Sequence, residues 1–187
     1  HFSDAYLETL AVYRKIADHI LSCDTLLFHG SVIAIDGEGY LFTAKSGTGK
    51  STHTRLWREY FGERAVMVND DKPLLHITDS GVTAYGTPWD GKHRLSTNTA
   101  VPLKGICILT RDTTNYIEQA EPHATYPMIV QQTNRSLSAD GMKQTLSLID
   151  RMLNVVPVYR LGCNMDIKAA RVAYEGMNRL KNRRKDA

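Results

Sequence analysis

The sequence Ala44-Lys45-Ser46-Gly47-Thr48-Gly49-Lys50-Ser51-Thr52 decides the fold expected for this chain. It follows the nucleotide-loop pattern G-x-x-x-x-G-K-[S/T], except that Ala44 replaces the first glycine. Gly47 and Gly49 let the backbone curl so that successive N–H groups point at phosphate oxygens. A helix that begins near Ser51 adds its positive end to this loop. We therefore predict a phosphate-binding loop between a strand and a helix; the alternative is a glycine turn that happens to precede a helix.

The chemistry expected of this loop is nucleotide binding together with a divalent cation. Lys50 is expected to reach the β- and γ-phosphates of ATP, and the Ser51 hydroxyl to coordinate Mg²⁺. The residues expected to contact the nucleotide are Ser46, Gly47, Thr48, Gly49, Lys50, Ser51 and Thr52. ATP and Mg²⁺ are thus the predicted cofactors, although the motif alone does not separate ATP from ADP or pyrophosphate.

Two adjacent carboxylates follow the apolar run at residues 65–68. They are Asp70 and Asp71, and they come after the kind of hydrophobic strand that commonly supplies a metal carboxylate to a phosphate loop. One of them is expected to hold Mg²⁺ while the other accepts a proton from an attacking hydroxyl, and the sequence leaves open which does which. The alternative is a solvated turn in which both aspartates cap Lys72-Pro73.

A histidine and a polar loop are further candidates for the site. His29 precedes Gly30 at the end of an apolar stretch, where a lone histidine is otherwise a structural residue. Residues 86–102 form a long polar segment, and long loops on compact domains often carry function. Lys92 and Arg94 in this segment are candidate substrate contacts, and the alternative is a surface turn.

The rest of the chain predicts an α/β fold. Strands are expected at residues 26–35, 40–44, 65–68, 74–78, 82–85, 103–109 and 155–161, and helices at 3–21, 51–61, 139–153 and 166–181. Glycine-containing turns at 36–39 and 79–81 predict two hairpins. Hairpins inserted among alternating strands and helices favour a mixed β-sheet flanked by helices, with Asp166 capping the last helix.

Composition bounds the class of protein. The 187 residues, 42% hydrophobic and 23% charged, suit a single domain over 1–187, and the start at His1 suggests a piece of a longer chain. The net charge of +3 is concentrated at residues 179–187, so nucleic acid is not an expected partner. No apolar run approaches the roughly 20 residues of a membrane span, and no signal peptide is visible. Three separated cysteines make no disulfide framework, which suits a cytoplasmic protein. A homo-oligomer is compatible with the sequence.

Taken together, His29-Gly30, the loop at 44–52 and Asp70-Asp71 resemble the catalytic core of HPr kinase/phosphorylase and of ATP-dependent phosphoenolpyruvate carboxykinase. The resemblance covers residues 26–71, and residues 86–109 are similar to uncharacterised bacterial HPr-kinase-like proteins with a Pro-Trp-x-Gly-Lys stretch. It implies that the aspartate pair supplies a catalytic base and a Mg²⁺ ligand. It also implies that His29 lies near the phosphates, that Lys50 steadies them and that Ser51 binds the metal.

The function expected from these features is a Mg²⁺-dependent kinase that transfers the ATP γ-phosphoryl group to a hydroxyl. The acceptor would be a serine in a protein or peptide, or a small hydroxylated metabolite. The alternative is a non-catalytic ATP-binding sensor or interaction module, which would tolerate loss of the carboxylate base. A GTPase is disfavoured because Thr110-Arg111-Asp112 is a poor substitute for the guanine-reading segment Asn-Lys-x-Asp.

Overall fold

A single mixed sheet organises the computed structural model, which describes residues 3–182. Its strands are β1 (Thr25–Leu27), β2 (Ser31–Ile35), β3 (Glu38–Thr43), β4 (Ala65–Asn69), β5 (Leu74–Thr78), β6 (Gly81–Tyr85), β7 (Ala100–Arg111), β8 (Tyr116–Gln119) and β9 (Val158–Cys163). The helices are α1 (Asp4–His19), α2 (Lys50–Phe61), α3 (Pro122–Gln132), α4 (Ala139–Val155) and α5 (Lys168–Asn182). Short 3₁₀ turns, Ile20–Cys23 and Gly62–Arg64, follow α1 and α2.

The sheet contains both parallel and antiparallel pairs, as predicted. Its strand order is β1-β5-β6-β7-β3-β2-β4, and β9 pairs with both β7 and β8. Strands β3, β7 and β9 run parallel to one another, and the other pairs are antiparallel. The carboxyl ends of β3, β7 and β9 therefore point to the same edge, where ligands bind in open α/β sheets.

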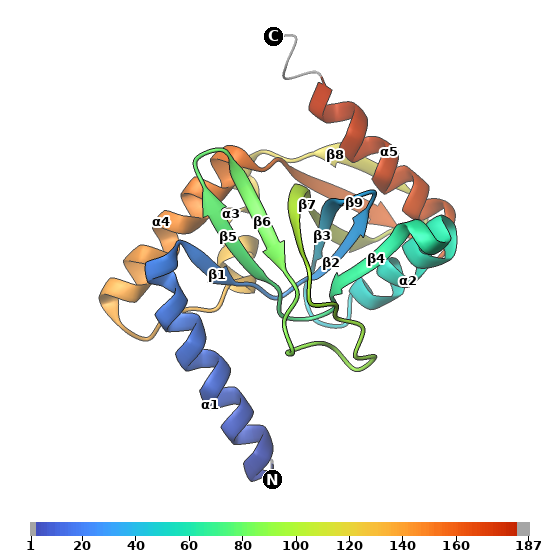
Figure 1. Cartoon of the computed structure of the whole chain (residues 1–187). Coiled ribbons are helices and arrows are strands. Elements are labelled where there is room, and N and C mark those ends of the chain that lie inside the picture. The colour runs from blue at the N-terminus through green and yellow to red at the C-terminus, as the bar shows by residue number, and fades with distance from the viewer. Residues whose placement is uncertain (1–2, 183–187) are drawn as a thin grey trace.

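Both faces of the central strands are buried against helices. Along β7, Ile106 and Ile108 join one hydrophobic cluster with α3 and α4, while Cys107 and Leu109 join another with α2 and α5. This division follows from the alternation of side chains along a strand. Figure 1 shows α2 and α5 together on one side of the molecule and α3 and α4 on the other. Burial on both faces explains why these strands are continuous apolar runs in the sequence.

The two predicted hairpins are confirmed. Strands β2 and β3 pair antiparallel around Asp36 and Gly37, whose φ angles are +52° and +82°. Two successive positive φ values are typical of the tight turns that match the twist of a hairpin. Strands β5 and β6 likewise pair around the turn that precedes Gly81.

Other sequence expectations need correction. The run at 26–35 is not one strand, because it divides at His29 and Gly30 into β1, which pairs with β5, and β2, which pairs with β3 and β4. Gly30 stands too close to the neighbouring strand for a side chain, since a Cβ there would lie 2.9 Å from the Phe42 carbonyl oxygen. The polar segment ends before β7 begins at Ala100, and the last strand begins at Val158 rather than 155. Sequence reasoning assigned no element to β8 or α3.

Helices α1 and α5 are capped at their N-termini by side chains, α5 by the predicted Asp166. The Ser3 side chain accepts a hydrogen bond from the Tyr6 N–H at the start of α1, and Asp166 Oδ1 accepts one from the Lys168 N–H at the start of α5. Helix α1 extends away from the sheet (Figure 1), and Tyr13 contacts Trp89 with ring centroids 5.9 Å apart. Within residues 3–182 no helix has the length and apolar character of a membrane span. The start of the chain at His1 and much of its basic end, residues 183–187, lie outside the described residues.

Candidate active site

The glycine-rich loop connects β3 to α2, and two of its glycines have positive φ angles. Gly47 and Gly49 have φ angles of +78° and +123°, which residues with a side chain adopt only with strain. The loop is closed by hydrogen bonds from the Thr48 N–H to the Lys45 carbonyl and from the His53 N–H to the Gly49 carbonyl. The arrangement leaves the positive end of α2 next to the loop.

Ala44, which replaces the first glycine of the pattern, is fully buried. Its methyl group belongs to the hydrophobic cluster that also contains Phe42 and Trp57. Its φ angle is not among the positive values found in the described part of the chain. The backbone at this position therefore does not require glycine, and the methyl group contributes to the core.

Asp70 lies in the interior, close to the first turn of α2. Its side chain is 4% exposed, and Oδ1 accepts a hydrogen bond from the Ser31 hydroxyl at 3.1 Å. Burial raises the pKa of Asp70, while Ser31, the charge of His93 and the Ser51 hydroxyl act in the opposite direction. The Oδ2 atom is buried and makes no hydrogen bond to the residues that the structure describes. Asp70 thus lies near Ser51 and has one buried carboxylate oxygen, Oδ2, without a hydrogen-bond partner in the described chain.

The side chain of Asn69 explains why two adjacent aspartates at the site have different surroundings. Its Oδ1 accepts hydrogen bonds from the N–H groups of Asp71 and Lys72, at 2.9 and 2.7 Å, which turns the chain sharply after β4. Its Nδ2 donates to the backbone and the hydroxyl oxygen of Thr87. The turn buries Asp70 and leaves the Asp71 side chain 36% exposed.

Asp71 contacts the predicted histidine. Its Oδ1 lies 3.3 Å from His29 Nε2 and 3.6 Å from Lys72 Nζ. His29 Nδ1 hydrogen-bonds the Gln132 side-chain oxygen at 2.7 Å, so Nδ1 carries the proton and Nε2 faces the carboxylate. Burial lowers the pKa of His29, with further lowering by the charges of Lys72 and Lys50 and opposing contributions from Asp71 and Gln132. His29 is therefore neutral at neutral pH.

Lys50 joins the same cluster. Burial lowers its pKa, whereas the charges of Asp71 and Asp70 raise it and that of Lys72 lowers it further. Lys50 therefore lies close enough to both aspartates for their charges to affect its pKa. The charge of Lys50 in turn lowers the pKa of His29. The structure thus brings together Lys50, Ser51, Asp70, Asp71 and His29.

The polar segment between β6 and β7 covers Asp70 through Gly91, and its two candidate substrate contacts stay predictions. Lys92 and Arg94 are both exposed, whereas Gly91 packs so closely that a Cβ there would lie 2.9 Å from Asp70 Oδ2. His93, between the two cations, is the residue whose charge affects the pKa of Asp70. Sequence reasoning did not assign a role to His93, nor to Ser31, Asn69, Gln132 or Arg111.

The donor set near Asp70 fits a magnesium ion better than a metal that needs a cage of side chains. No group of three or more His, Cys, Asp or Glu residues suited to a metal occurs between residues 3 and 182. Mg²⁺ is usually held by one or two carboxylates together with phosphate oxygens and water. The unpartnered Asp70 Oδ2 and the nearby Ser51 hydroxyl would supply the protein part of such a site.

Two clefts adjoin the loop. One, of about 500 Å³, lies between the loop, α2 and the turn after β9, and Thr52 and His53 line it. The other, of about 580 Å³, lies between the loop and α3, and Lys45, Ser46 and Met128 line it. Either volume suits a ligand the size of a nucleoside or a small metabolite. Gly47, Thr48 and Arg111 border both clefts.

Comparison with known proteins gives a match in solved structures. No protein-family model matches the chain. No curated protein matches it either. The chain is similar to the structure of the Hpr(Ser) kinase/phosphatase from Coxiella burnetii, with 12% sequence identity and a TM-score of 0.46, over 86% of this chain and 95% of that chain.

Proposed function

We propose that this protein is a Mg²⁺-dependent kinase that transfers the γ-phosphoryl group of ATP to a hydroxyl. The observation that supports it most is that Lys50 and Ser51 of the glycine-rich loop lie near two carboxylates that follow a different strand, β4. Phosphoryl transfer needs little beyond positioning, charge neutralisation and a base for the incoming hydroxyl. The acceptor is a serine hydroxyl of a protein or peptide, or a hydroxyl of a small metabolite.

The two aspartates differ in surroundings, which supports different roles. Asp70 is buried near Ser51 with one unpartnered oxygen, so we assign it to the metal. Asp71 is more exposed and lies beside the neutral His29, so we assign it as the base. Magnesium, when bound, would neutralise charge on the phosphates.

In this proposal Asp71 accepts the proton of the acceptor hydroxyl. The hydroxyl oxygen forms a bond to the γ-phosphorus, and the bond from that phosphorus to the β–γ bridging oxygen breaks, which releases ADP. The lone pair of His29 Nε2, 3.3 Å from Asp71 Oδ1, can then share the proton that Asp71 has taken up. Lys50 and the loop N–H groups bind the phosphates and hold them in line for attack.

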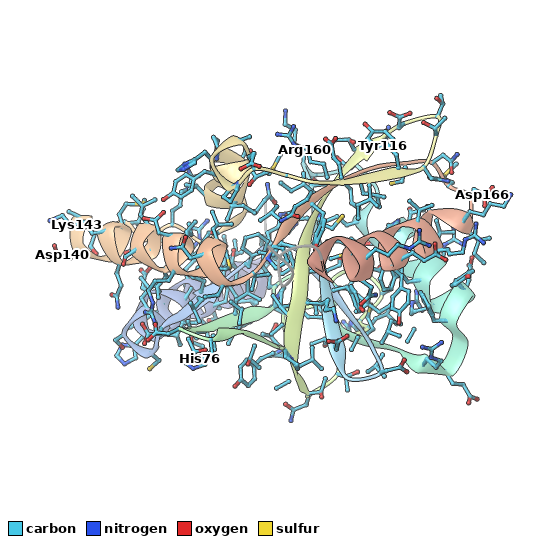
Figure 2. The ribbon with its side chains drawn as sticks, turned by 90° about the horizontal axis from the view of Figure 1, so that it is seen from above. His76, Tyr116, Asp140, Lys143, Arg160 and Asp166 are labelled. Carbon is cyan, nitrogen blue, oxygen red and sulfur yellow. The ribbon has the colours of Figure 1, made fainter. Side chains whose placement is uncertain are left out.

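The experiment that tests this function is an untargeted search for phosphorylated products. A cell extract is supplied with γ-labelled ATP and either the wild type, Asp71→Asn or the control variant Asp140→Asn. Asp140 is a suitable control because it is almost fully exposed at the start of α4, beside Lys143 and away from α2 (Figure 2). We expect labelled products with the wild type and with Asp140→Asn, and a loss of roughly 100-fold or more with Asp71→Asn.

Absence of any labelled product with the wild type, alongside retained ATP binding, would contradict the kinase. That result would instead support the alternative, a sensor or interaction module that binds ATP without turnover. Equal transfer by the wild type and Asp71→Asn would leave a kinase but remove Asp71 as its base.

A further inference from the structure

Arg111 connects the end of β7 to the glycine loop. Its Nη2 donates a hydrogen bond to the Gly47 carbonyl oxygen at 2.6 Å, and its Nε donates to the Thr48 carbonyl oxygen at 3.2 Å. One guanidinium group thus binds two consecutive carbonyl groups of the loop.

The register of the sheet places Arg111 at this point. Strand β3 ends opposite Ile108 of the parallel β7, and β7 continues to Arg111 at the level of the loop. Cys107 and Leu109 face α2 and α5, so the alternation of side chains puts Arg111 on that same side. The position of Arg111 beside the loop therefore depends on the register of the sheet and not on the conformation of the loop.

Binding two carbonyls has a consequence for the loop N–H groups. In a trans peptide the C=O and N–H bonds point in opposite directions. Fixing the Thr48 carbonyl toward Arg111 therefore turns the Gly49 N–H toward the opposite side of the loop. The Thr48 N–H is already used by the Lys45 carbonyl, so Gly49 is the donor that this contact orients for a ligand.

We infer that Arg111 is a positioning residue for phosphate binding, which holds the glycine loop in its anion-binding conformation. The inference rests on the proposed function, because it assumes that a polyphosphate binds to this loop. A loop with two flexible glycines samples other conformations, and its affinity falls in proportion to the fraction of molecules in the binding conformation. Arg111 raises that fraction and would thereby affect binding of the phosphates more than any later chemical step.

The test compares Arg111→Gln and Arg111→Lys with the control Arg160→Gln. Arg160 is also an exposed arginine of the sheet that donates to a carbonyl, that of Ala124, but it lies on the β8 side near Tyr116 (Figure 2). Dissociation constants for MgATP and for inorganic tripolyphosphate are measured by calorimetry, together with amide hydrogen exchange of residues 45–49 in the ligand-free protein. Thermal unfolding of each variant shows whether it is folded.

We expect Arg111→Gln to weaken the binding of MgATP and of tripolyphosphate by a similar factor of roughly tenfold. It should also speed amide hydrogen exchange in the loop and change kcat less than KM. Arg111→Lys, which keeps a charged donor, should recover part of the affinity, and Arg160→Gln should match the wild type. Unchanged tripolyphosphate affinity or unchanged loop exchange in a folded Arg111→Gln variant would overturn the inference while leaving the proposed function intact. A wild type that binds neither ligand would overturn the proposed function itself.

Discussion

His29 Nε2 lies 3.3 Å from Asp71 Oδ1 at the point where two chain segments are joined by a backbone hydrogen bond, from the Gly30 N–H to the Asp71 carbonyl. The backbone bond fixes the distance between the segments, and Gln132 fixes the orientation of the imidazole ring. The carboxylate thus faces an unprotonated nitrogen rather than solvent alone. This relationship distinguishes Asp71 from Asp70 and underlies the first prediction.

Replacement of His29 by Gln should lower kcat by roughly 10- to 100-fold and change the MgATP dissociation constant by no more than about threefold, because His29 acts on the proton and not on the phosphates. Since the pKa of His29 is lowered from its ordinary value, the wild type should keep full kcat at pH 7 and lose it only at a pH lower than that at which a free histidine takes up a proton. The steady-state pH profile should be flatter in His29→Gln. An equal loss of ATP affinity would show that His29 binds the nucleotide instead.

Restoration of the loop pattern by Ala44→Gly should not improve nucleotide binding. Ala44 is fully buried, so its removal takes away a packed methyl group and adds backbone freedom to the unfolded chain. We expect the free energy of unfolding to fall by about 1–2 kcal/mol in urea denaturation. A gain in MgATP affinity would show that the methyl group obstructs the loop.

Substitution of Gly49 by Ala should strain the loop. At a φ of +123° an alanine is disfavoured by about 1–3 kcal/mol, so the loop will either lose stability or adopt another conformation that binds ATP less well. Gly81→Ala is the matched control, because no atom lies within 4 Å of the added Cβ and its φ is outside the left-handed range. Equal behaviour of the two variants in unfolding and in ATP binding would refute the assigned loop geometry.

His53 should make the stability of the protein depend on pH. Burial lowers its pKa from 6.5 to about 3, and its Nε2 accepts a hydrogen bond from Trp57 Nε1. As the pH falls, His53 therefore takes up a proton in the unfolded state before it does so in the folded state. The free energy of unfolding is highest above pH 6.5 and decreases as the pH falls from there toward 3. The slope from this group alone is about 1.4 kcal/mol per pH unit well below pH 6.5.

The measurement for His53 is urea unfolding of the wild type and of His53→Gln at a series of pH values from 7 to 4.5. Glutamine can still accept from Trp57 but does not titrate, so the difference in unfolding free energy between the two proteins should shrink or reverse toward low pH. A difference that stays constant with pH would mean that His53 is accessible to protons in the folded state.

Local patterns in the sequence were enough to predict much of the fold and the position of the glycine loop. The hairpin at Asp36-Gly37 and the strand–loop–helix unit around Gly49 depend on backbone preferences that neighbouring residues determine. The contacts within the site could not be predicted in this way. Gln132 binds His29, and Arg111 binds Gly47, although each pair is far apart in the sequence and only the sheet topology brings its members together. The opposite surroundings of Asp70 and Asp71 depend on the two hydrogen bonds that Asn69 Oδ1 accepts, which alternation along a strand does not predict.

The most direct test of the central claim, that the loop and the aspartates form one magnesium–nucleotide site, is calorimetric titration with ATP in the presence and absence of Mg²⁺. Wild-type protein should bind ATP at least about tenfold more tightly with Mg²⁺, and Asp70→Asn should lose that difference while it still binds ATP through the loop. Identical Mg²⁺ dependence in the wild type and Asp70→Asn would contradict the claim.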